Sequence, residues 1–313
     1  LFDESLCEQG RNFNNKIWNA FRLVKGWKTD ERLPQPEAAV LAVKWFRERL
    51  NRTLAEMNDS FEKYRLSEAM MAAYKLFRDE FSSWYLELVK PAYEQPVDAQ
   101  TCRDTLGFFD TLLRLLHPFM PFITEELWQA LSPRLAGESV MMAPAPVPGE
   151  TCPEEAEACL QAFERVKEVT GAVRTLRLQK NLPNREALVL EVAGSSHDSR
   201  WDAAIMKMAC LEEIRPVAEK SAGAVSFLAG TTEYAVPLGN RTDAAEEQAR
   251  TETELRYLKG FLASVMKKLG NEKFVANARP EVVENERKKQ ADAESKIRTL
   301  EEGLKQLGQN RPV

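Results

Sequence analysis

The residues best suited to chemistry are few, and none of them forms a recognisable active site. The 313-residue chain contains two histidines. His117 lies in the apolar stretch LHPFMPF, which is typical of a packing or capping role, and His197 lies in the polar loop SSHDS without nearby cysteines or paired carboxylates that would hold a metal. No phosphate-binding glycine loop, Walker motif or G-x-S-x-G elbow occurs. We therefore predict no catalytic residue and no metal site.

The cysteine count, the lack of long apolar runs and the net charge exclude several classes of protein. An odd count of five cysteines without a C-x-x-C pair argues against a disulfide framework and favours reduced thiols in a cytoplasmic protein. No apolar run has the length of a membrane span, and no signal peptide is recognisable, so we expect no membrane partner. The net charge is −5, so any surface for nucleic acid must be local.

One such surface is predicted near the amino terminus, in the strip GRNFNNKIWNAFR. At helical spacing the apolar residues Phe13, Ile17, Ala20, Phe21 and Val24 share one face, and Arg11, Asn15, Asn19 and Arg22 share another. Residues 11–28 carry five cations and no acid: Arg11, Lys16, Arg22, Lys25 and Lys28. The alternative interpretation is an ordinary solvated helix face.

A second candidate surface lies on the next predicted helix. Trp45, Arg49 and Arg52 recur at i, i+4 and i+7, opposite an apolar stripe of Val43, Phe46, Leu50, Leu54, Met57 and Phe61. An indole beside two guanidiniums suits an unstacked base next to a phosphate. The alternative is a tryptophan at the margin of the core, shielded by the arginine stems.

A third positive surface is predicted near the carboxyl terminus. Two runs of apolar residues at heptad spacing, Leu255–Leu269 and Ala293–Leu307, flank GNEKFVANARP, with Gly270 placed to end one helix and Pro280 to begin the next. This pattern predicts an antiparallel coiled-coil hairpin. Residues 256–298 carry eleven cations and six acids. The alternative is a solvated coiled-coil surface.

These elements predict a mainly α fold in three domains. Residues 1–150 are expected to form an antiparallel helical bundle with a Pro/Gly-rich linker, residues 151–241 a small α/β domain with three or four strands, and residues 242–313 the coiled-coil arm.

Several long strings resemble a known family. GRNFNNKIWNAFR resembles the helix that follows the catalytic domain in class I valyl-, isoleucyl- and leucyl-tRNA synthetases, and LLRLLHPFMPFITEELWQAL is similar to later helices of the same anticodon-binding bundle. KKLGNEKFVANARPEVVENER is similar to the carboxy-terminal arm of the bacterial valyl enzymes. The cysteine zinc tail common in isoleucyl enzymes is absent.

The resemblance implies the tRNA-binding part of a longer ligase. The family's H-I-G-H and K-M-S-K-S motifs and its editing domain are missing, and the chain starts without Met, as an excised piece would. We therefore expect a fragment that binds tRNA(Val) but is inactive alone and holds no cofactor. The parent enzyme would use ATP with Mg²⁺ to activate valine. The expected partners are tRNA(Val) and the upstream catalytic and editing domains of the same chain, with no DNA and a monomeric state.

The resemblance also suggests where RNA would bind. The residues expected at the anticodon are Arg11, Asn15, Trp18, Asn19, Arg22, Trp45, Arg49 and Arg52. Those expected on the arm are Lys267, Lys268, Lys273, Arg279, Arg287, Lys288 and Lys289. Two other functions stay open: the same region of an isoleucyl or leucyl enzyme, and a non-catalytic helical module that binds a protein.

Overall fold

The structure is a computed structural model that describes residues 4–194, 196–238, 244–270, 283–287, 289, 290, 293, 294 and 297. The chain divides into two compact units. The first comprises Leu1–Lys220 with Val225–Val236, and the second comprises Ser221–Ala224 with Pro237–Val313. The predicted division into three domains stays a prediction.

The chain up to residue 131 is almost wholly helical, as predicted. Its helices are α1 (Glu4–Lys25), α2 (Glu37–Glu62), α3 (Leu66–Lys75), η1 (Leu76–Tyr85), α4 (Leu86–Val89), α5 (Ala99–Leu116) and α6 (Pro121–Leu131). The η1 segment is π-helical and joins α3 to α4 without a break. Pro91 follows the end of α4, and Pro121 stands first in α6, where a missing N–H costs the helix nothing. Prolines therefore mark both boundaries.

Two very short strands tie loops of this helical part together. They are β1 (Thr29–Asp30) and β2 (Val97–Asp98), which pair in parallel. Asp98 is also the N-cap of α5, because its carboxylate accepts a hydrogen bond of 2.8 Å from the Thr101 amide. The start of α5 is thus fixed to the segment that follows α1.

Aromatic rings fill the core of the helical part. The predicted stripe on α2 is buried from Val43 to Met57, whereas Phe61 at its end is 38% exposed. Phe46 has no exposed surface and contacts the rings of Phe81 and Tyr85 at centroid distances of 5.3 and 5.0 Å. The Tyr85 hydroxyl lies 2.8 Å from the hydroxyl of Thr105, and burial raises the pKa of Tyr85.

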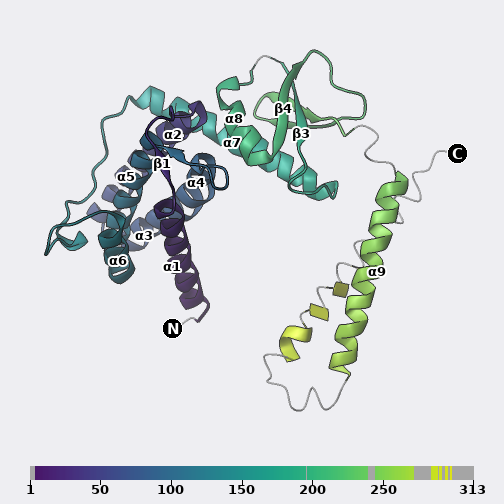
Figure 1. Ribbon diagram of the computed structural model, residues 1–313, viewed down its shortest axis with the longest axis horizontal. Helices are drawn as coiled ribbons and strands as arrows, with labels where there is room; N and C mark the ends of the chain where they lie inside the picture. The colour runs from purple at the N-terminus through teal and green to yellow at the C-terminus, as the bar shows by residue number, and fades with distance from the viewer. Residues whose placement is uncertain are drawn as a thin grey trace. The chain divides into compact units, whose positions relative to one another are not determined.

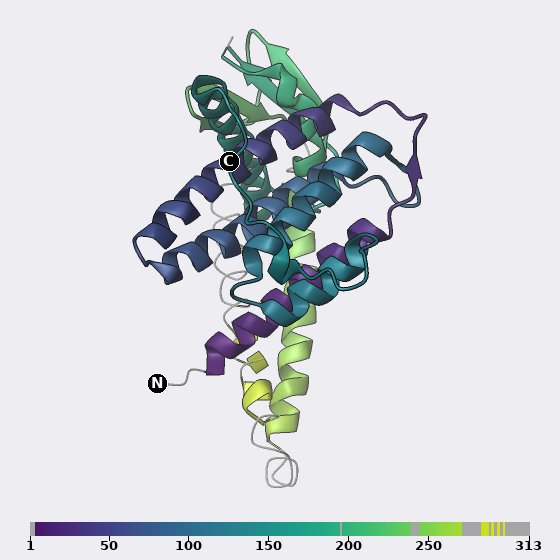
Figure 2. The ribbon, with the colours of Figure 1, turned by 90° about the vertical axis from the view of Figure 1, so that its left-hand side faces the viewer.

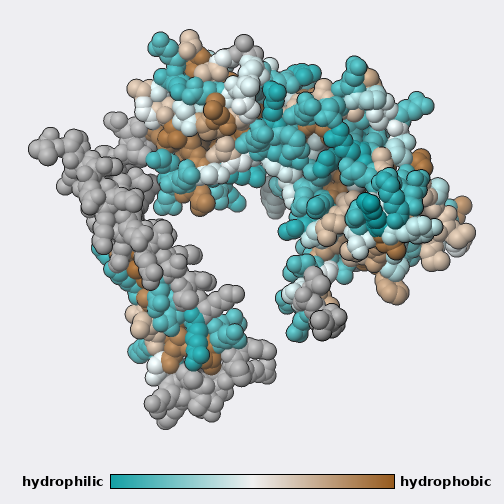
Figure 3. Space-filling view, turned by 180° about the vertical axis from the view of Figure 1, so that it is seen from behind, coloured by the Kyte–Doolittle hydropathy of each residue, from teal (hydrophilic) through white to brown (hydrophobic). Residues whose placement is uncertain are grey.

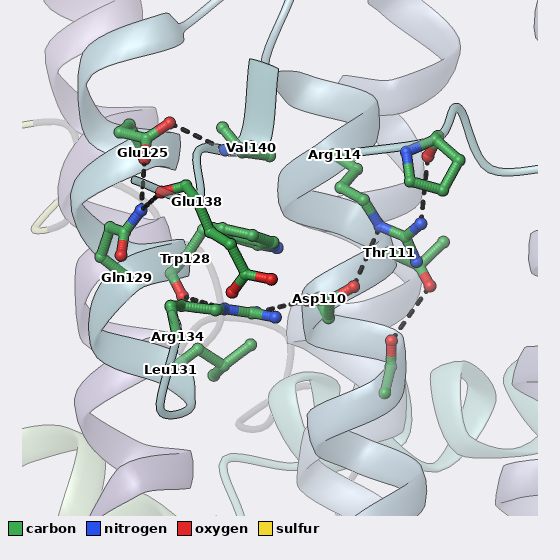
Figure 4. A network of polar contacts seen from close by, with 12 residues as sticks. Asp110, Thr111, Arg114, Glu125, Trp128, Gln129, Leu131, Arg134, Glu138 and Val140 are labelled. Carbon is green, nitrogen blue, oxygen red and sulfur yellow. Dashed lines mark hydrogen bonds and ion pairs between the residues drawn. The ribbon is translucent and has the colours of Figure 1, made fainter. Parts of the chain in front are cut away.

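A polar network fastens the connector after α6 to the bundle (Figure 4). Asp110 of α5 pairs with Arg114 at 2.9 Å and with Arg134 at 2.8 Å, and the Arg134 guanidinium lies 3.5 Å from the ring centroid of Trp128. Arg114 also donates to the Pro144 carbonyl at 3.1 Å, on the far side of the short 3₁₀ turn η2 (Val140–Met142). The proline-rich connector is therefore held along its length.

A long helix leads into an α/β part, as predicted. Its elements are α7 (Pro153–Gln179), β3 (Leu188–Ala193), η3 (Ser199–Trp201), α8 (Asp202–Ala209), β4 (Leu211–Val217), β5 (Val225–Ala229) and β6 (Thr232–Val236). The four strands form one sheet in the order β4-β3-β6-β5, in which β3 and β4 are parallel and the other neighbours antiparallel. The α8 crossover connects the parallel pair, and α7 and α8 lie alongside the sheet (Figure 1).

The second unit is dominated by α9 (Ala244–Leu269). Residues 283–287 form a helical segment, and Glu286 there lies 3.7 Å from Lys268 of α9. Val265, Val283, Ala293 and Ile297 are buried. Figure 3 shows hydrophobic residues among hydrophilic ones along α9. On this helix, Tyr257 is 72% exposed and Met266 is 52% exposed. The helix of the first heptad run is confirmed, and the coiled-coil hairpin as a whole stays a prediction because residues 298–307 lie outside the described part.

None of the helices in the described ranges combines the length and the apolar character that crossing a membrane requires.

Candidate nucleic-acid interface

Helix α1 is fixed to the bundle by the apolar face that its sequence predicts. Phe13, Ile17, Ala20 and Val24 are buried, and Phe21 is half-buried. The Phe13 ring contacts Tyr74 and Phe77 at centroid distances of 4.6 and 5.7 Å. In Figure 2, α1 runs alongside α6, and the two helices are in contact. The opposite face of α1 is thereby turned outward.

That outward face carries five of the predicted RNA-binding residues, all of them exposed: Arg11, Asn15, Trp18, Asn19 and Arg22. The Trp18 side chain is 42% exposed although its ring touches Phe21 at 6.2 Å. Arg11 has a loose ion pair with Glu8 at 3.5 Å. Within the described ranges, the side chains of Asn15, Asn19 and Arg22 have no hydrogen-bond or ion-pair partner. The face therefore presents free donors, acceptors and charge.

Two other cations of α1 are used inside the protein instead. Lys16 donates to the Ser83 hydroxyl at 3.2 Å, and burial and then the Arg78 charge lower the pKa of Lys16. Lys25 donates to the Leu131 carbonyl at 3.1 Å, at the end of α6. Both side chains bind α1 to its neighbours, whereas Arg11 pairs with Glu8 of its own helix and Arg22 has no partner among the described residues.

A groove opens beside the carboxyl end of α1. It has a volume of about 620 Å³ and lies between residues 22–28 and the loop of residues 90–95. Arg22, Lys28 and Lys90 contribute to its lining, so three cations face a space that holds one acid, Glu94. The groove is a continuation of the outward face of α1, because Arg22 belongs to both.

Two aromatic side chains also line this groove. Tyr93 is 90% exposed and belongs to the same lining as the three cations. Trp27 is half-buried, and its indole nitrogen is buried without a hydrogen-bond partner in the described part of the chain. Glu94, next to Tyr93, has a φ of 61°, which non-glycine residues rarely adopt. An exposed ring beside guanidinium and ammonium groups suits an unstacked base and its phosphate. Of these groups, the Lys90 ammonium is paired with Glu87 at 2.5 Å.

Trp45 is buried and does not contribute to the second predicted surface, which corrects the expectation for this residue. Trp45 has no exposed surface, because α7 covers it and Phe163 stacks on its ring at 3.7 Å. A base has no access to this indole.

The two arginines beside Trp45 are neutralised by acids from other elements. Arg49 lies 3.4 Å from Glu80 of η1, and Arg52 pairs with Glu157 of α7. Lys167 joins the same cluster through contacts of 2.8 Å with Glu80 and 2.9 Å with Glu164. Trp45 therefore belongs to the core between α2 and α7, whereas Arg49 and Arg52 lie beside it with side chains that are 33% and 43% exposed.

On the arm, the described part of the chain includes four of the seven predicted residues. Lys267, Lys268, Arg287 and Lys289 are exposed. Lys268 and Lys289 both approach Glu286, at 3.7 and 2.7 Å, and the hydrogen bond from Lys289 lowers the pKa of Glu286. Lys267 and Arg287 have no such partner among the described residues. Lys273, Arg279 and Lys288 lie outside the described residues.

Three groove residues were missed from the sequence: Lys28 as part of a groove, Lys90 and Tyr93. The sequence KPAYEQP indicates an exposed loop, because two prolines flank a short polar segment that contains one aromatic residue. The pairing of this loop with the end of α1 is long-range, however, and no local pattern predicts it.

Neither histidine forms a metal site, and among the described residues no group of three or more potential metal ligands occurs. His117 lies at the end of α5, where its Nδ1 atom is 2.8 Å from the Thr124 hydroxyl. His197 lies between Asp202 and Tyr234, at 2.5 and 3.0 Å.

Comparison with known proteins identifies two families in the chain. Residues 43–193 match the model for the anticodon-binding domain of tRNA ligase. Residues 243–308 match the model for the valyl tRNA synthetase tRNA binding arm. The first match includes α2 to α7 and β3, and the second includes α9.

The chain is similar over almost its whole length to several curated proteins. The chain is 64% identical over 306 residues to the valine–tRNA ligase of Parabacteroides distasonis, covering 98% of this chain and 34% of the relative. It is 58% identical to the valine–tRNA ligase of Porphyromonas gingivalis, with the same coverage, and 31% identical to that of Agrobacterium fabrum, covering 96% of this chain and 32% of the relative. The chain thus spans about a third of the length of the relatives it matches. The chain therefore carries an anticodon-binding domain of tRNA ligases and a valyl tRNA synthetase tRNA binding arm, and along almost its whole length it is similar to one part of valine–tRNA ligases.

Proposed function

We propose that this chain is the part of a valine–tRNA ligase that grips tRNA(Val), with the anticodon loop on the outward face of α1 and in the groove at its end. The observation that carries the proposal is the position of Arg22. Its guanidinium has no partner within the described ranges, and it lines the same groove as Tyr93, which is 90% exposed. A phosphate on Arg22 would place the attached base within reach of a ring.

In this proposal the groove and the outward face of α1 have different roles in binding the RNA. Cations attract the backbone and fix the register of the RNA, whereas side chains with both donor and acceptor atoms read base edges. Asn15 and Asn19 each offer an amide with two donor hydrogens and one acceptor oxygen. Because they lie one turn apart on the outward face that ends at Arg22, they are the side chains placed to read a base whose phosphate sits on Arg22.

The arm supplies a second contact to the same RNA in this proposal. Its exposed cations Lys267 and Arg287 have no side-chain partner in the described part of the chain, so they remain available to phosphates. The coiled-coil hairpin would contact the folded RNA by backbone and shape, and we expect Lys273, Arg279 and Lys288 to add to its charge.

The whole protein would be the enzyme that joins valine to tRNA(Val) with ATP and Mg²⁺. The names of the relatives support this activity, and catalysis would belong to the remaining two thirds of such a protein. This chain would contribute positioning and selection of the tRNA, as a monomer in the cytoplasm.

Binding of a short RNA hairpin that carries the valine anticodon loop tests the proposal. Tyr93→Ala should weaken binding by about 1–3 kcal/mol, the usual contribution of one base stacked on an aromatic ring. Tyr64→Ala is the matched control, because Tyr64 is also 90% exposed but belongs to the turn between α2 and α3. Equal losses from the two variants would contradict the groove as the binding site.

A change in the RNA separates base reading from charge alone. The second and third letters of valine anticodons are A and C, so a hairpin with G in place of that A should bind more weakly. Unchanged affinity would contradict base reading. A hairpin with an isoleucine or leucine anticodon that competes better than the valine hairpin would favour a sibling enzyme.

A protein-interaction module is the second candidate, and exposed apolar side chains on α9 favour it. Tyr257 and Met266 are 72% and 52% exposed. Self-association that rises with protein concentration, together with no RNA binding at low salt, would support this candidate and contradict the first.

A further inference from the structure

Lys207 links the α/β part to the loop that forms one side of the groove. The Lys207 ammonium group, on α8, donates to the Leu88 carbonyl at 2.8 Å and to the Lys90 carbonyl at 2.7 Å. Leu88 lies near the end of α4, and Lys90 is the first residue of the loop of residues 90–95 that carries Tyr93. One side chain thus spans from the sheet-bearing part to the edge of the groove.

Without Lys207, these two carbonyl oxygens would lack a hydrogen-bond donor among the described residues at the end of α4. The last carbonyls of a helix lack partners within the helix, and Pro91 ends α4 without supplying an N–H. A cation at a helix carboxyl terminus is also favoured by the helix dipole. Lys207 therefore caps α4 from a different part of the chain.

The position of Lys207 is itself fixed by α7. The Arg174 guanidinium donates to the Met208 carbonyl at 2.8 Å, and Arg177 donates to the carbonyls of Ala209 and Cys210 at 3.0 and 2.8 Å. These bonds hold the last turn of α8, so the ammonium group is presented from a rigid support. Burial and the neighbouring Lys90 charge lower the pKa of Lys207, which is the cost of placing it there.

The other end of the loop is held independently. The Val97 amide donates to the Lys28 carbonyl at 2.8 Å, next to the β1–β2 pair. Within the loop, the Gln95 amide donates to the Ala92 carbonyl at 3.0 Å. The chain is thus held after the loop, at Val97, by the segment that follows α1, and at Lys90 by α8, and Tyr93 lies between these two points.

We propose that Lys207 is a positioning residue for RNA binding, which holds Tyr93 at the groove through the carbonyls of Leu88 and Lys90. This proposal rests on the groove being the RNA site proposed above. It gives the α/β part a role in recognition without any contact between Lys207 and the RNA.

The test uses the full 313-residue chain and the hairpin with the valine anticodon loop. Lys207→Met should weaken binding about fivefold, equivalent to about 1 kcal/mol, because one end of the loop is released. Lys207→Arg keeps donors for both carbonyls and should restore most of the affinity. Lys180→Met removes a lysine at the end of α7 whose side chain has no partner in the described part, and it should bind like the wild type.

A double-mutant cycle with Tyr93→Ala separates positioning from stability. If Lys207 acts through Tyr93, the Tyr93→Ala change should cost much less affinity in the Lys207→Met background than in the wild type. Multiplicative losses, or a Lys207→Met loss matched by Lys180→Met, would overturn the proposal. If Lys207→Met unfolds the chain, the same cycle is run with Lys207→Ala, which also has no donor, and is judged by the same outcomes.

Failure of the broader function gives a different result. A wild-type chain that binds no hairpin at low salt would contradict the RNA site itself, whereas a wild-type chain that binds and a Lys207→Met chain that binds equally well would contradict only the role of Lys207.

Discussion

The indole ring of Trp45 lies on the phenyl ring of Phe163, with centroids 3.7 Å apart and planes 25° from parallel. This stack joins α2 to α7 and closes the side of α2 that its sequence suggested was open. Phe163 also has no exposed surface and touches Trp84 and Trp201 edge-on at 5.7 and 5.3 Å. The contact is therefore central to the packing of the α/β part on the bundle.

Truncating Phe163 should destabilise the chain strongly. Phe163→Ala removes a ring packed among three tryptophans, and we expect a loss of about 3–5 kcal/mol in the free energy of unfolding. Urea denaturation measures the change. Phe122→Ala is the matched control, since Phe122 is 91% exposed, and its loss should stay within about 0.5 kcal/mol. Similar midpoints for the two variants would mean that α7 does not pack on Trp45 as described.

The Asp110 carboxylate should be a second point of high sensitivity. It is shared by Arg114 and Arg134, whose side chains are 23% and 18% exposed, and it lies at the centre of the network in Figure 4. Asp110→Asn leaves both partly buried guanidiniums without a counter-charge, so we expect a loss of about 1–3 kcal/mol by urea denaturation.

A surface ion pair provides the comparison for Asp110. Asp59→Asn breaks a pair with Lys63 in which both side chains are more than half exposed, and it should change stability by at most about 0.5 kcal/mol. An Asp110→Asn loss no larger than that of Asp59→Asn would show that the connector is held by its apolar contacts alone.

The contact between α9 and residues 283–287 should weaken at acid pH. The hydrogen bond from Lys289 lowers the pKa of Glu286 from its ordinary value of 4.5. A carboxylate with a lowered pKa in the folded state stabilises that state above its ordinary pKa, and this contribution is lost as the pH falls through the lowered value. Acid should therefore loosen this contact.

Hydrogen exchange of the peptides around Val265 measures the effect. Wild type and Glu286→Gln are compared at the same pH, so that the intrinsic exchange rate cancels. At neutral pH the variant should exchange faster, and the difference should vanish well below pH 4.5, where Glu286 is protonated. A difference that persists in acid would rule out the charge of Glu286 as its cause.

Local patterns in the sequence were sufficient for most of the elements. The stripe from Val43 to Met57 located α2, and Pro121 located the start of α6, because apolar periodicity and proline chemistry act within a few residues. The π-helical turn of η1 was not predicted, since its residues read as an ordinary amphipathic helix. A sheet of three or four strands was predicted and the structure has four, but their order depends on tertiary contacts.

The candidate site shows the same division. The outward face of α1 followed from helical periodicity, and the structure places Arg22 and Asn15 there. The prediction that Trp45 is accessible was wrong, because Phe163, which covers it, lies in a helix distant in sequence. The arginines next to Trp45 in the sequence do not distinguish an exposed helix face from an interface with another helix. The groove beside Tyr93 was missed because it needs two loops brought together by β1 and β2.

In the proposed complex the RNA meets Arg22, which has no partner among the described residues, and not the paired arginines of α2. The salt dependence of hairpin binding tests this contact most directly, with Arg22→Gln and Arg52→Gln compared against the wild type. If Arg22 contacts a phosphate, its variant should bind about tenfold more weakly at low salt and reduce the slope of log K against log salt by about one unit. Because Arg52 is paired with Glu157, the Arg52→Gln variant should bind like the wild type at low salt and show the same slope. A normal slope for Arg22→Gln, or a reduced slope for Arg52→Gln, would contradict this account.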